Sequence, residues 1–221
     1  MYIKELASYI DQTSLRPDAT EKEIREFVEL SAPLGFATLC VPPCRVALVK
    51  KLLGNSGTLV STVAGFPLGF HMPGVKLLEA RTAFDNGASE IDMVLNVSEL
   101  KSGNASFVAD EISAIVKAVP GALIKVIIET CYLTDEEKLA ALEAAVSSGA
   151  RFVKTSTGFG PKGADVRDIE LLKQAARGRI KVKASGGIKT LTSALSMIEA
   201  GAARLGTSSG PAILEELKSG S

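Results

Sequence analysis

The sequence contains little histidine, little cysteine and no tryptophan. Among its 221 residues there are one histidine and three cysteines. Catalytic zinc sites usually draw on about three protein ligands, with histidine prominent among them, so the single His71 excludes a histidine-built zinc centre. The scarcity of histidine does not exclude a magnesium ion held by carboxylates. Three cysteines are an odd number and too few for a disulfide framework, which predicts a reducing, cytoplasmic location.

Net charge and long apolar runs are also absent. Lysine and arginine number 25, aspartate and glutamate number 25, and the formal net charge is zero. Nucleic-acid-binding domains usually carry a basic excess, so no nucleic-acid partner is expected. No apolar run approaches the roughly 18 residues of a membrane span, and residues 1–6 lack the layout of a signal peptide. With 46% hydrophobic residues the chain can bury a core, and we expect a soluble globular protein without a membrane partner.

Short apolar, β-branched runs alternate with longer amphipathic stretches along the chain. Seven such runs are clear, at residues 38–41, 59–64, 91–95, 123–128, 152–155, 181–184 and 204–206. Thr20 with Glu23 and Thr134 with Glu137 have capping-box spacing, which indicates that helices begin there. Strands that alternate with helices predict βαβ units and a parallel sheet.

The number of these units favours a barrel. With an eighth strand over residues 10–15, the 221 residues supply eight units of about 28 residues, enough for a strand, a helix and two short turns. No change of composition and no long linker divides the chain. We therefore predict an α/β fold with one domain over residues 1–221, a (β/α)₈ TIM barrel, and keep an open doubly wound sheet as the alternative.

Charged residues occur inside the expected strands, where a parallel sheet is normally apolar on both faces. Side chains alternate along a strand, so Ile91 and Met93 share one face while Asp92 lies on the other. The apolar face must contact the helices, which directs a charged set toward the barrel axis: Asp92, Lys125, Glu129, Lys154 and Lys183. A half-exposed antiparallel sheet and an interior ion network without chemistry are the alternatives. Burial of such charges is costly, and its occurrence on consecutive strands indicates a functional site.

Three inward lysines and one aspartate favour one class of reaction. A lysine amine that is crowded by other cations in a low-dielectric pocket loses its proton readily and becomes a nucleophile at neutral pH. Such a lysine forms a Schiff base with an aldehyde or a ketone. The protonated imine then withdraws electrons while an adjacent carbon–carbon bond breaks or forms.

Two loops rich in glycine and serine follow the last two strands. Ser185–Ile188 comes after the strand of Lys183, and Gly206–Pro211 opens the last helix. Glycines let backbone N–H groups approach an anion, and barrels of this kind often bind phosphate with the loops after strands seven and eight. Ordinary turns with helix caps are the alternative for either loop alone. Together the two loops predict a phosphate site.

A further glycine-rich segment, Gly158–Gly163, matches the G-x-G-x-x-G pattern of dinucleotide-binding folds. Such a fold requires an acidic residue about 20 positions further on, near the end of the next strand. The corresponding stretch, Arg179–Lys183, contains only basic and apolar residues. We therefore expect a loop that closes over the substrate and no nicotinamide cofactor.

Six segments in this order resemble the deoxyribose-phosphate aldolase family. They are residues 10–20, 90–94, 125–130, 153–159, 182–187 and 204–209. The resemblance implies a (β/α)₈ barrel that reversibly cleaves 2-deoxy-D-ribose 5-phosphate to acetaldehyde and D-glyceraldehyde 3-phosphate, without a metal or another cofactor. It also implies a homo-oligomer, a dimer or a tetramer, whose other partner is the small phosphosugar substrate.

The same resemblance implies roles for individual residues. Lys154 matches the Schiff-base lysine, Lys183 the neighbouring lysine and Asp92 the carboxylate that relays protons. Asp11 and Thr157 match positions near the sugar. The positions at the phosphate end are matched by Gly158, Gly186, Gly187, Ser208 and Ser209. The sequence departs from the family at Gln12 and Arg16, where many members have histidine and lysine, and we expect effects there on loop order or subunit contacts.

We expect neighbouring cations to activate Lys154. Lys183 lies on the adjacent strand with its side chain on the same inward face, and Lys125 adds to its repulsion. Desolvation of the amine acts in the same direction, while Asp92 opposes both effects but can pair with Lys183 instead. The expected result is a lowered pKa for Lys154, with cationic repulsion as the decisive cause.

Two other functions stay open at this point. An isomerase or epimerase with the same barrel would use lysine and aspartate as acid–base groups and form no covalent adduct. A non-catalytic sensor would bind the phosphosugar without turnover. Reduction of an imine onto the protein excludes the first, and release of glyceraldehyde 3-phosphate excludes the second.

Overall fold

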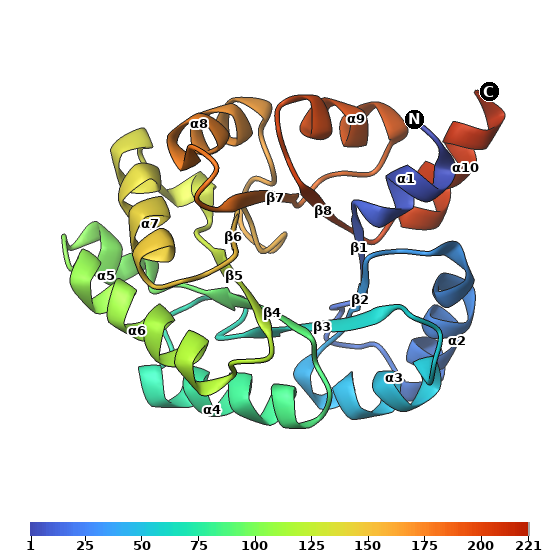
Figure 1. Ribbon diagram of the computed structural model, residues 1–221, viewed down its shortest axis with the longest axis horizontal. Helices are drawn as coiled ribbons and strands as arrows, with labels where there is room; N and C mark the ends of the chain where they lie inside the picture. The colour runs from blue at the N-terminus through green and yellow to red at the C-terminus, as the bar shows by residue number, and fades with distance from the viewer. Residues whose placement is uncertain (221) are drawn as a thin grey trace.

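The computed structural model describes residues 1–220, which form a closed barrel of eight parallel strands (Figure 1). The strands are β1 (Ile10–Thr13), β2 (Thr38–Cys40), β3 (Leu59–Ala64), β4 (Glu90–Val94), β5 (Leu123–Ile127), β6 (Phe152–Lys154), β7 (Lys181–Ser185) and β8 (Arg204–Thr207). Parallel pairing of β1 with β8, in which Ile10 lies opposite Leu205, closes the barrel. The predicted barrel is therefore confirmed, and the alternatives of an open sheet and of an antiparallel sheet are wrong.

Helices surround the strands as a ring, and the two ends of the chain lie on the same side of it (Figure 1). The helices are α1 (Ile3–Ser8), α2 (Glu21–Ser31), α3 (Val46–Leu53), α4 (Pro73–Asp85), α5 (Val97–Lys101), α6 (Ala105–Ala118), α7 (Asp135–Ser147), α8 (Val166–Ala176), α9 (Leu191–Glu199) and α10 (Gly210–Ser219). Within residues 1–220, none of them has both the length and the apolar character needed to cross a membrane.

The helices begin and end for local reasons. The Thr20 and Thr134 hydroxyls each accept a hydrogen bond from the N–H three residues later, and both capping boxes are complete. Gly87, Gly149 and Gly201 follow helices with φ angles of 102°, 82° and 107°, a conformation that other residues rarely adopt. These short connections return the chain directly to the next strand.

The apolar core lies between the strands and the helices. Ile91 and Met93 of β4 and Val126 of β5 are fully buried and belong to this core. The alternate residues of the same strands, Asp92 and Lys125, contact each other instead. The inside of the barrel is therefore polar, and this polar interior contains the candidate site.

Candidate active site

Asp92 is the centre of the polar interior. Its side chain is fully buried and accepts hydrogen bonds from lysines on three successive strands. The Nζ of Lys125 lies 2.7 Å from Oδ1, while Oδ2 is shared by Lys154 at 2.9 Å and Lys183 at 2.7 Å. The strand register produces this arrangement, because Asp92 lies opposite Lys125 and Lys154 lies opposite Lys183.

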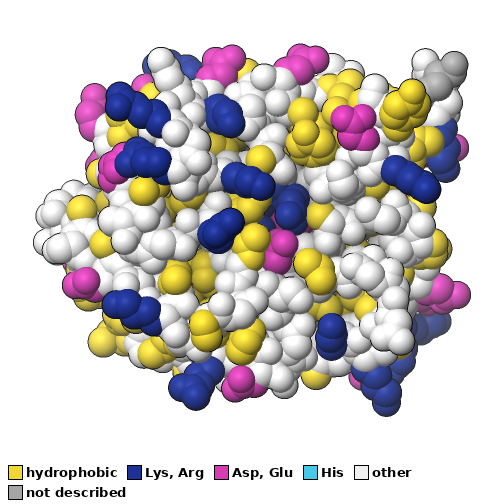
Figure 2. All heavy atoms as spheres, viewed as in Figure 1, with side chains coloured by type: hydrophobic (Ala, Val, Ile, Leu, Met, Phe, Trp, Pro, Cys, Tyr) yellow, Lys and Arg dark blue, Asp and Glu magenta, His cyan; other side chains and the backbone are white. Residues whose placement is uncertain are grey.

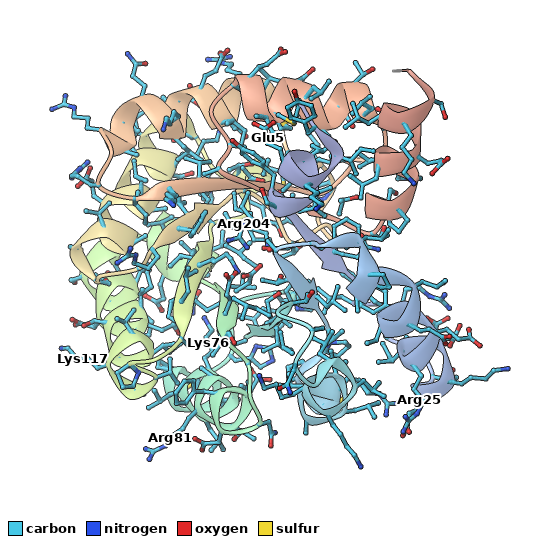
Figure 3. All side chains as sticks on the ribbon, turned by 45° about the vertical axis from the view of Figure 1, so that its right-hand side comes forward. Glu5, Arg25, Lys76, Arg81, Lys117 and Arg204 are labelled. Atoms are coloured by element: carbon cyan, nitrogen blue, oxygen red, sulfur yellow. The ribbon has the colours of Figure 1, made fainter. Side chains whose placement is uncertain are left out.

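A second set of charges lies beside this centre. The Asp11 carboxylate contacts Lys183 Nζ at 2.5 Å and the Arg204 guanidinium at 2.6 Å. Glu90 contacts Lys125 at 2.6 Å and Arg204 at 3.2 Å. Arg204 extends from β8 near the centre of the barrel (Figure 3), and its side chain is only 15% exposed. On the face drawn in Figure 2, basic and acidic side chains likewise gather over the middle of the barrel.

The network has an excess of one positive charge when all its groups are ionised. It consists of four cations and three carboxylates, namely Lys125, Lys154, Lys183 and Arg204 against Asp11, Glu90 and Asp92. An uncompensated charge is costly in a low-dielectric interior, so loss of one proton is favoured. Lys154 is the group that loses it most readily, because its pKa is lowered, mainly by burial, while those of the other three cations are raised.

Burial is the largest cause of the lowered pKa of Lys154. The attraction of Asp92 raises this pKa, and the repulsion of Lys183 lowers it again with a smaller effect. The direction of the predicted shift is therefore right, but its expected main cause is wrong. Asp92 also does not leave Lys154 for Lys183, because one carboxylate oxygen contacts both amines.

The other lysines are held in their charged form. Burial lowers the pKa of Lys183, but the attraction of Asp11 and Asp92 outweighs burial, and the pKa is raised. Lys125 has a raised pKa for the same reason, with Asp92 as its strongest partner. Burial also opposes ionisation of Asp92 itself, yet the three lysines keep its pKa well below the usual value. The interior thus combines one lysine that readily becomes neutral with two that stay protonated.

A cavity of about 460 Å³ opens above Lys154. Six of the predicted site residues line it, namely Lys154, Thr157, Gly158, Gly186, Gly187 and Ser208. Asp92 and Lys183 are buried beside the Lys154 amine and do not line the cavity. Twelve further residues line the cavity, and three of them have long polar or charged side chains that the sequence analysis did not assign to the site: Gln12, Arg16 and Lys189. Lys189 lies two residues after Gly187, so its position beside a predicted phosphate loop was the signal that could have found it.

Glycines bring the loops after β6 and β7 into close contact. The Gly186 carbonyl accepts a hydrogen bond of 3.0 Å from the Ala164 N–H. A Cβ atom on Gly163 would lie 2.2 Å from the same carbonyl oxygen, so no other residue fits there without displacement of one loop. The segment Gly158–Gly163 thus packs against the predicted phosphate loop, and its first two residues, Gly158 and Phe159, line the cavity.

Gln12 holds the loop that precedes α10. Its amide nitrogen donates to the Ser208 carbonyl at 3.2 Å, and its oxygen accepts from the Gly210 N–H at 3.0 Å. These two hydrogen bonds are a physical basis for the effect on loop order that the sequence predicts at Gln12. Arg16 is exposed and pairs with Asp18 at 2.9 Å on the rim of the cavity.

Two residues that were expected to contact the substrate lie away from the cavity. Asp11 is fully buried among Lys183, Arg204 and the Thr38 hydroxyl. The Ser209 N–H donates to the Thr207 hydroxyl at 2.9 Å, and Ser209 does not line the cavity. The structure therefore places Asp11 behind Lys183 and leaves Ser208 as the lining serine of its loop.

Glu129 does not point toward the barrel axis as the strand alternation predicted. β5 ends at Ile127, and Glu129 adopts a left-handed conformation with φ 52° and ψ 67°. This turn carries its carboxylate to the Thr157 N–H on the neighbouring loop. The prediction is wrong because alternation holds only while the backbone stays extended.

Comparison with known proteins yields close relatives. The model of the DeoC/LacD family of aldolases matches residues 6–216. The deoxyribose-phosphate aldolase of Caldanaerobacter subterraneus subsp. tengcongensis is 49% identical over 216 residues, which cover 96% of this chain and 94% of that protein. An aldolase named QR15 superposes with a TM-score of 0.94 at 47% identity, with 97% and 96% of the two chains covered. The tetrameric deoxyribose phosphate aldolase of Aeropyrum pernix gives 0.93 at 36% identity, with 100% and 94% covered.

Proposed function

The chain belongs to the DeoC/LacD family of aldolases, and we propose that it reversibly cleaves 2-deoxy-D-ribose 5-phosphate to acetaldehyde and D-glyceraldehyde 3-phosphate. One observation carries this proposal. Lys154 is a buried lysine with a pKa lowered mainly by burial, and it lies at the base of a cavity whose rim has glycine and serine loops suited to phosphate. An amine in this position can form an imine with the open-chain aldehyde.

The chemistry begins at Lys154. Its neutral amine adds to the C1 aldehyde, and protons pass through Asp92 and Lys183 as the carbinolamine loses water to give the imine. A base, Asp92 acting through a water molecule, takes the proton of the 3-hydroxyl group. The C2–C3 bond then breaks, its electrons form the enamine, and glyceraldehyde 3-phosphate leaves. Protonation of the enamine and hydrolysis of the new imine release acetaldehyde and restore Lys154.

Asp92 and Lys183 suit these proton transfers. Each contacts the other within 2.7 Å, and Asp92 also contacts the reacting amine, so a proton need cross only one hydrogen bond at a time. Positioned acid–base groups of this kind contribute roughly 10²–10⁴-fold to a rate. We assign Asp11 to the support of Lys183, which it holds protonated and oriented from behind.

The phosphate end of the substrate is assigned to the opposite side of the cavity. Gly186 and Gly187 follow β7, and Ser208 follows β8 at the start of α10, where N–H groups attract an anion. Lys189 on the rim adds positive charge, whereas the charge of Arg16 is paired with Asp18. The distance between Lys154 and these loops then determines the length of substrate that fits the cavity.

The family context also bears on assembly and location. We propose a homo-oligomer, a dimer or a tetramer, supported by the tetramer described for the Aeropyrum pernix relative. Exposed apolar side chains at Leu68, Phe70, Met72 and Leu78 give such contacts a surface. We also propose that the protein works in the cytoplasm, a location that suits its three free thiols at Cys40, Cys44 and Cys131.

A coupled assay for glyceraldehyde 3-phosphate tests the reaction. Incubation with 2-deoxy-D-ribose 5-phosphate should release it continuously, and prolonged treatment with a chelator should leave the rate unchanged, because the imine alone serves as the electron sink. Binding without release would indicate a sensor. Conversion of the substrate to an isomer without cleavage would indicate an isomerase.

A further inference from the structure

Glu129 is a buried carboxylate that the proposed reaction does not use. Its side chain is 3% exposed, and within residues 1–220 no cationic group lies within ion-pair distance of it. Its left-handed backbone, with φ 52°, is a conformation that residues other than glycine seldom adopt. A buried charge and a left-handed backbone are each costly, and their occurrence together indicates that Glu129 has a function.

Thr157 supplies two hydrogen-bond donors to the Glu129 carboxylate, and the Cys131 thiol, which does not line the catalytic cavity, is a third donor at 3.9 Å. The Thr157 N–H lies 3.2 Å from Oε2, and the Thr157 hydroxyl donates to the same oxygen. Thr157 lies three residues after Lys154 and lines the catalytic cavity. Glu129 therefore acts on the cavity through a single neighbouring side chain.

The hydroxyl group of Thr157 has its only proton committed to Glu129. The same oxygen accepts a hydrogen bond of 3.0 Å from the Phe159 N–H. A threonine hydroxyl offers one donor and two acceptor lone pairs. Once the donor and one lone pair are used, only an acceptor remains for a ligand in the cavity.

We propose that Glu129 is a positioning residue that makes Thr157 a hydrogen-bond acceptor for one hydroxyl group of the substrate. This inference rests on the proposed function, in which C1 is attached to Lys154 and the phosphate lies against the loops after β7 and β8. The 3-hydroxyl must face Asp92 to lose its proton. The 4-hydroxyl lies between the reacting carbons and the phosphate, and Thr157, three residues after Lys154, lines the same cavity as Lys154 and these loops.

A hydroxyl that can only accept distinguishes between substrates. The Thr157 hydroxyl can accept a hydrogen bond from an alcohol at C4, but it forms none with a methylene or a carbonyl at the same position. In the direction of synthesis, the acceptor aldehyde brings this hydroxyl as the group next to its carbonyl. The enzyme should therefore prefer D-glyceraldehyde 3-phosphate to 3-oxopropyl phosphate, which has the same carbon chain and phosphate but lacks that hydroxyl.

The test compares these two acceptors in addition to acetaldehyde and measures kcat/KM for each. In Glu129→Gln the amide can donate to the Thr157 oxygen and release its proton. The preference for glyceraldehyde 3-phosphate should then fall about tenfold, the effect of one lost hydrogen bond, while kcat/KM for 3-oxopropyl phosphate changes little. Thr157→Val should give the same fall, and Thr157→Ser should keep the preference of the wild type.

The double variant Glu129→Gln, Thr157→Val separates positioning from a general structural effect. If Glu129 acts through Thr157, the double variant loses no more preference than Thr157→Val alone. Glu111→Gln is the matched control, because Glu111 in α6 is also 3% exposed but contacts Lys76 at 2.9 Å outside the site. It should unfold at a lower temperature than the wild type and keep the wild-type preference.

Two results with the single variant Glu129→Gln would overturn the inference while the proposed reaction stands. They are an unchanged preference in Glu129→Gln and an equal loss of kcat/KM for both acceptors, which would mean that Glu129 merely anchors the loop. Additive losses in the double variant would also contradict it. If the wild type forms no product from either acceptor, the proposed function itself fails, and this is seen before any variant is compared.

Discussion

At the scale of single residues, the decisive feature is that three lysines share Asp92 but differ in their other carboxylate partners. Lys125, Lys154 and Lys183 all contact Asp92, but Lys125 and Lys183 have additional carboxylate partners in Glu90 and Asp11. Within residues 1–220, Asp92 is the only carboxylate within ion-pair distance of Lys154, whose amine borders the cavity. Burial therefore lowers the pKa of Lys154, whereas the extra partners overcome burial at the other two.

The substitution Lys183→Leu should raise the pKa of Lys154. It removes a neighbouring positive charge and leaves Asp92 with one partner fewer, and both changes favour the charged form of Lys154. The acidic limb of the kcat/KM profile, which reports the free enzyme, should shift toward alkaline pH. Turnover should recover only in part at high pH, because we expect Lys183 to move protons as well.

The contrary outcome of this experiment is a loss by the same factor at every pH. Lys183 would then act only as a proton carrier, and burial alone would set the pKa of Lys154. A temperature-dependent unfolding curve for Lys183→Leu is the control, since the variant leaves Asp11 paired with Arg204 at 2.6 Å.

The residue scale also shows what the sequence could and could not supply. Alternation along strands was enough to place Asp92, Lys125 and Lys183 inside the barrel, because those strands are extended. It failed at Glu129, where the backbone turns to φ 52°. No local pattern could show that Asp11 lies behind Lys183, because the two are 172 residues apart and meet only when β1 closes the barrel against β8.

At the scale of elements, the site depends on contact between the loops after β6 and β7. Gly158 and Gly163 belong to the first loop and Gly186 to the second, and their backbones approach with no room for a side chain at Gly163 or Gly186. The sequence showed glycine-rich loops at the ends of these strands. It could not show that the two loops pack against each other, because this contact depends on the curvature of the barrel.

Gly163→Ala tests this contact between the loops. The added methyl group would lie 2.2 Å from the Gly186 carbonyl oxygen, so one loop must move. Displacement by about 1 Å at a binding site can cost up to roughly 100-fold, and we expect kcat/KM for 2-deoxy-D-ribose 5-phosphate to fall toward that limit. Overpacking should also lower the free energy of unfolding by about 1–3 kcal/mol.

Gly74→Ala is the matched control for this change. Gly74 lies in α4, has nothing within 4 Å of an added Cβ, and needs no left-handed backbone. It should stabilise the protein slightly, by about 0.5–1 kcal/mol, and leave the kinetics unchanged. Wild-type kinetics in Gly163→Ala would contradict the account of the loops.

At the scale of the whole molecule, a formal net charge of zero conceals a segregated distribution of charge. Four cations and three carboxylates lie in the barrel network, so the other 21 cations and 22 carboxylates of the chain carry a formal net charge of −1. The composition predicts no nucleic-acid partner, but it gives no sign of the charged barrel interior. The count of strand–helix units predicted the barrel, and the weakest of its strands in sequence, β1, supplies the pairing that closes it.

The buried carboxylates should make the free energy of unfolding depend on pH in the acidic range. The pKa of Asp11 is lowered, because Lys183, Lys125 and Arg204 outweigh burial, so Asp11 stays ionised in the folded protein at pH values where the unfolded chain binds a proton. Its ionised form therefore contributes stability above its ordinary pKa of 3.8, and this contribution is lost as the pH falls below that value.

The variant Asp11→Asn isolates this contribution. Every cation keeps a partner, because Lys183 retains Asp92 and Arg204 retains Glu90. The wild type should be more stable than the variant in urea at pH 7. Below about pH 4 the difference in unfolding free energy should shrink by about 1.4 kcal/mol per pH unit. A difference that stays constant from pH 7 to pH 3 would show that Asp11 titrates alike in both states.

The covalent step at Lys154 is the central claim, and reductive trapping tests it most directly. Borohydride added during turnover of 2-deoxy-D-ribose 5-phosphate should reduce the imine and inactivate the protein. Mass spectrometry should show one adduct per chain, and peptide mapping should place it on Lys154. An adduct on Lys125 or Lys183, or turnover with no adduct at all, would contradict the account.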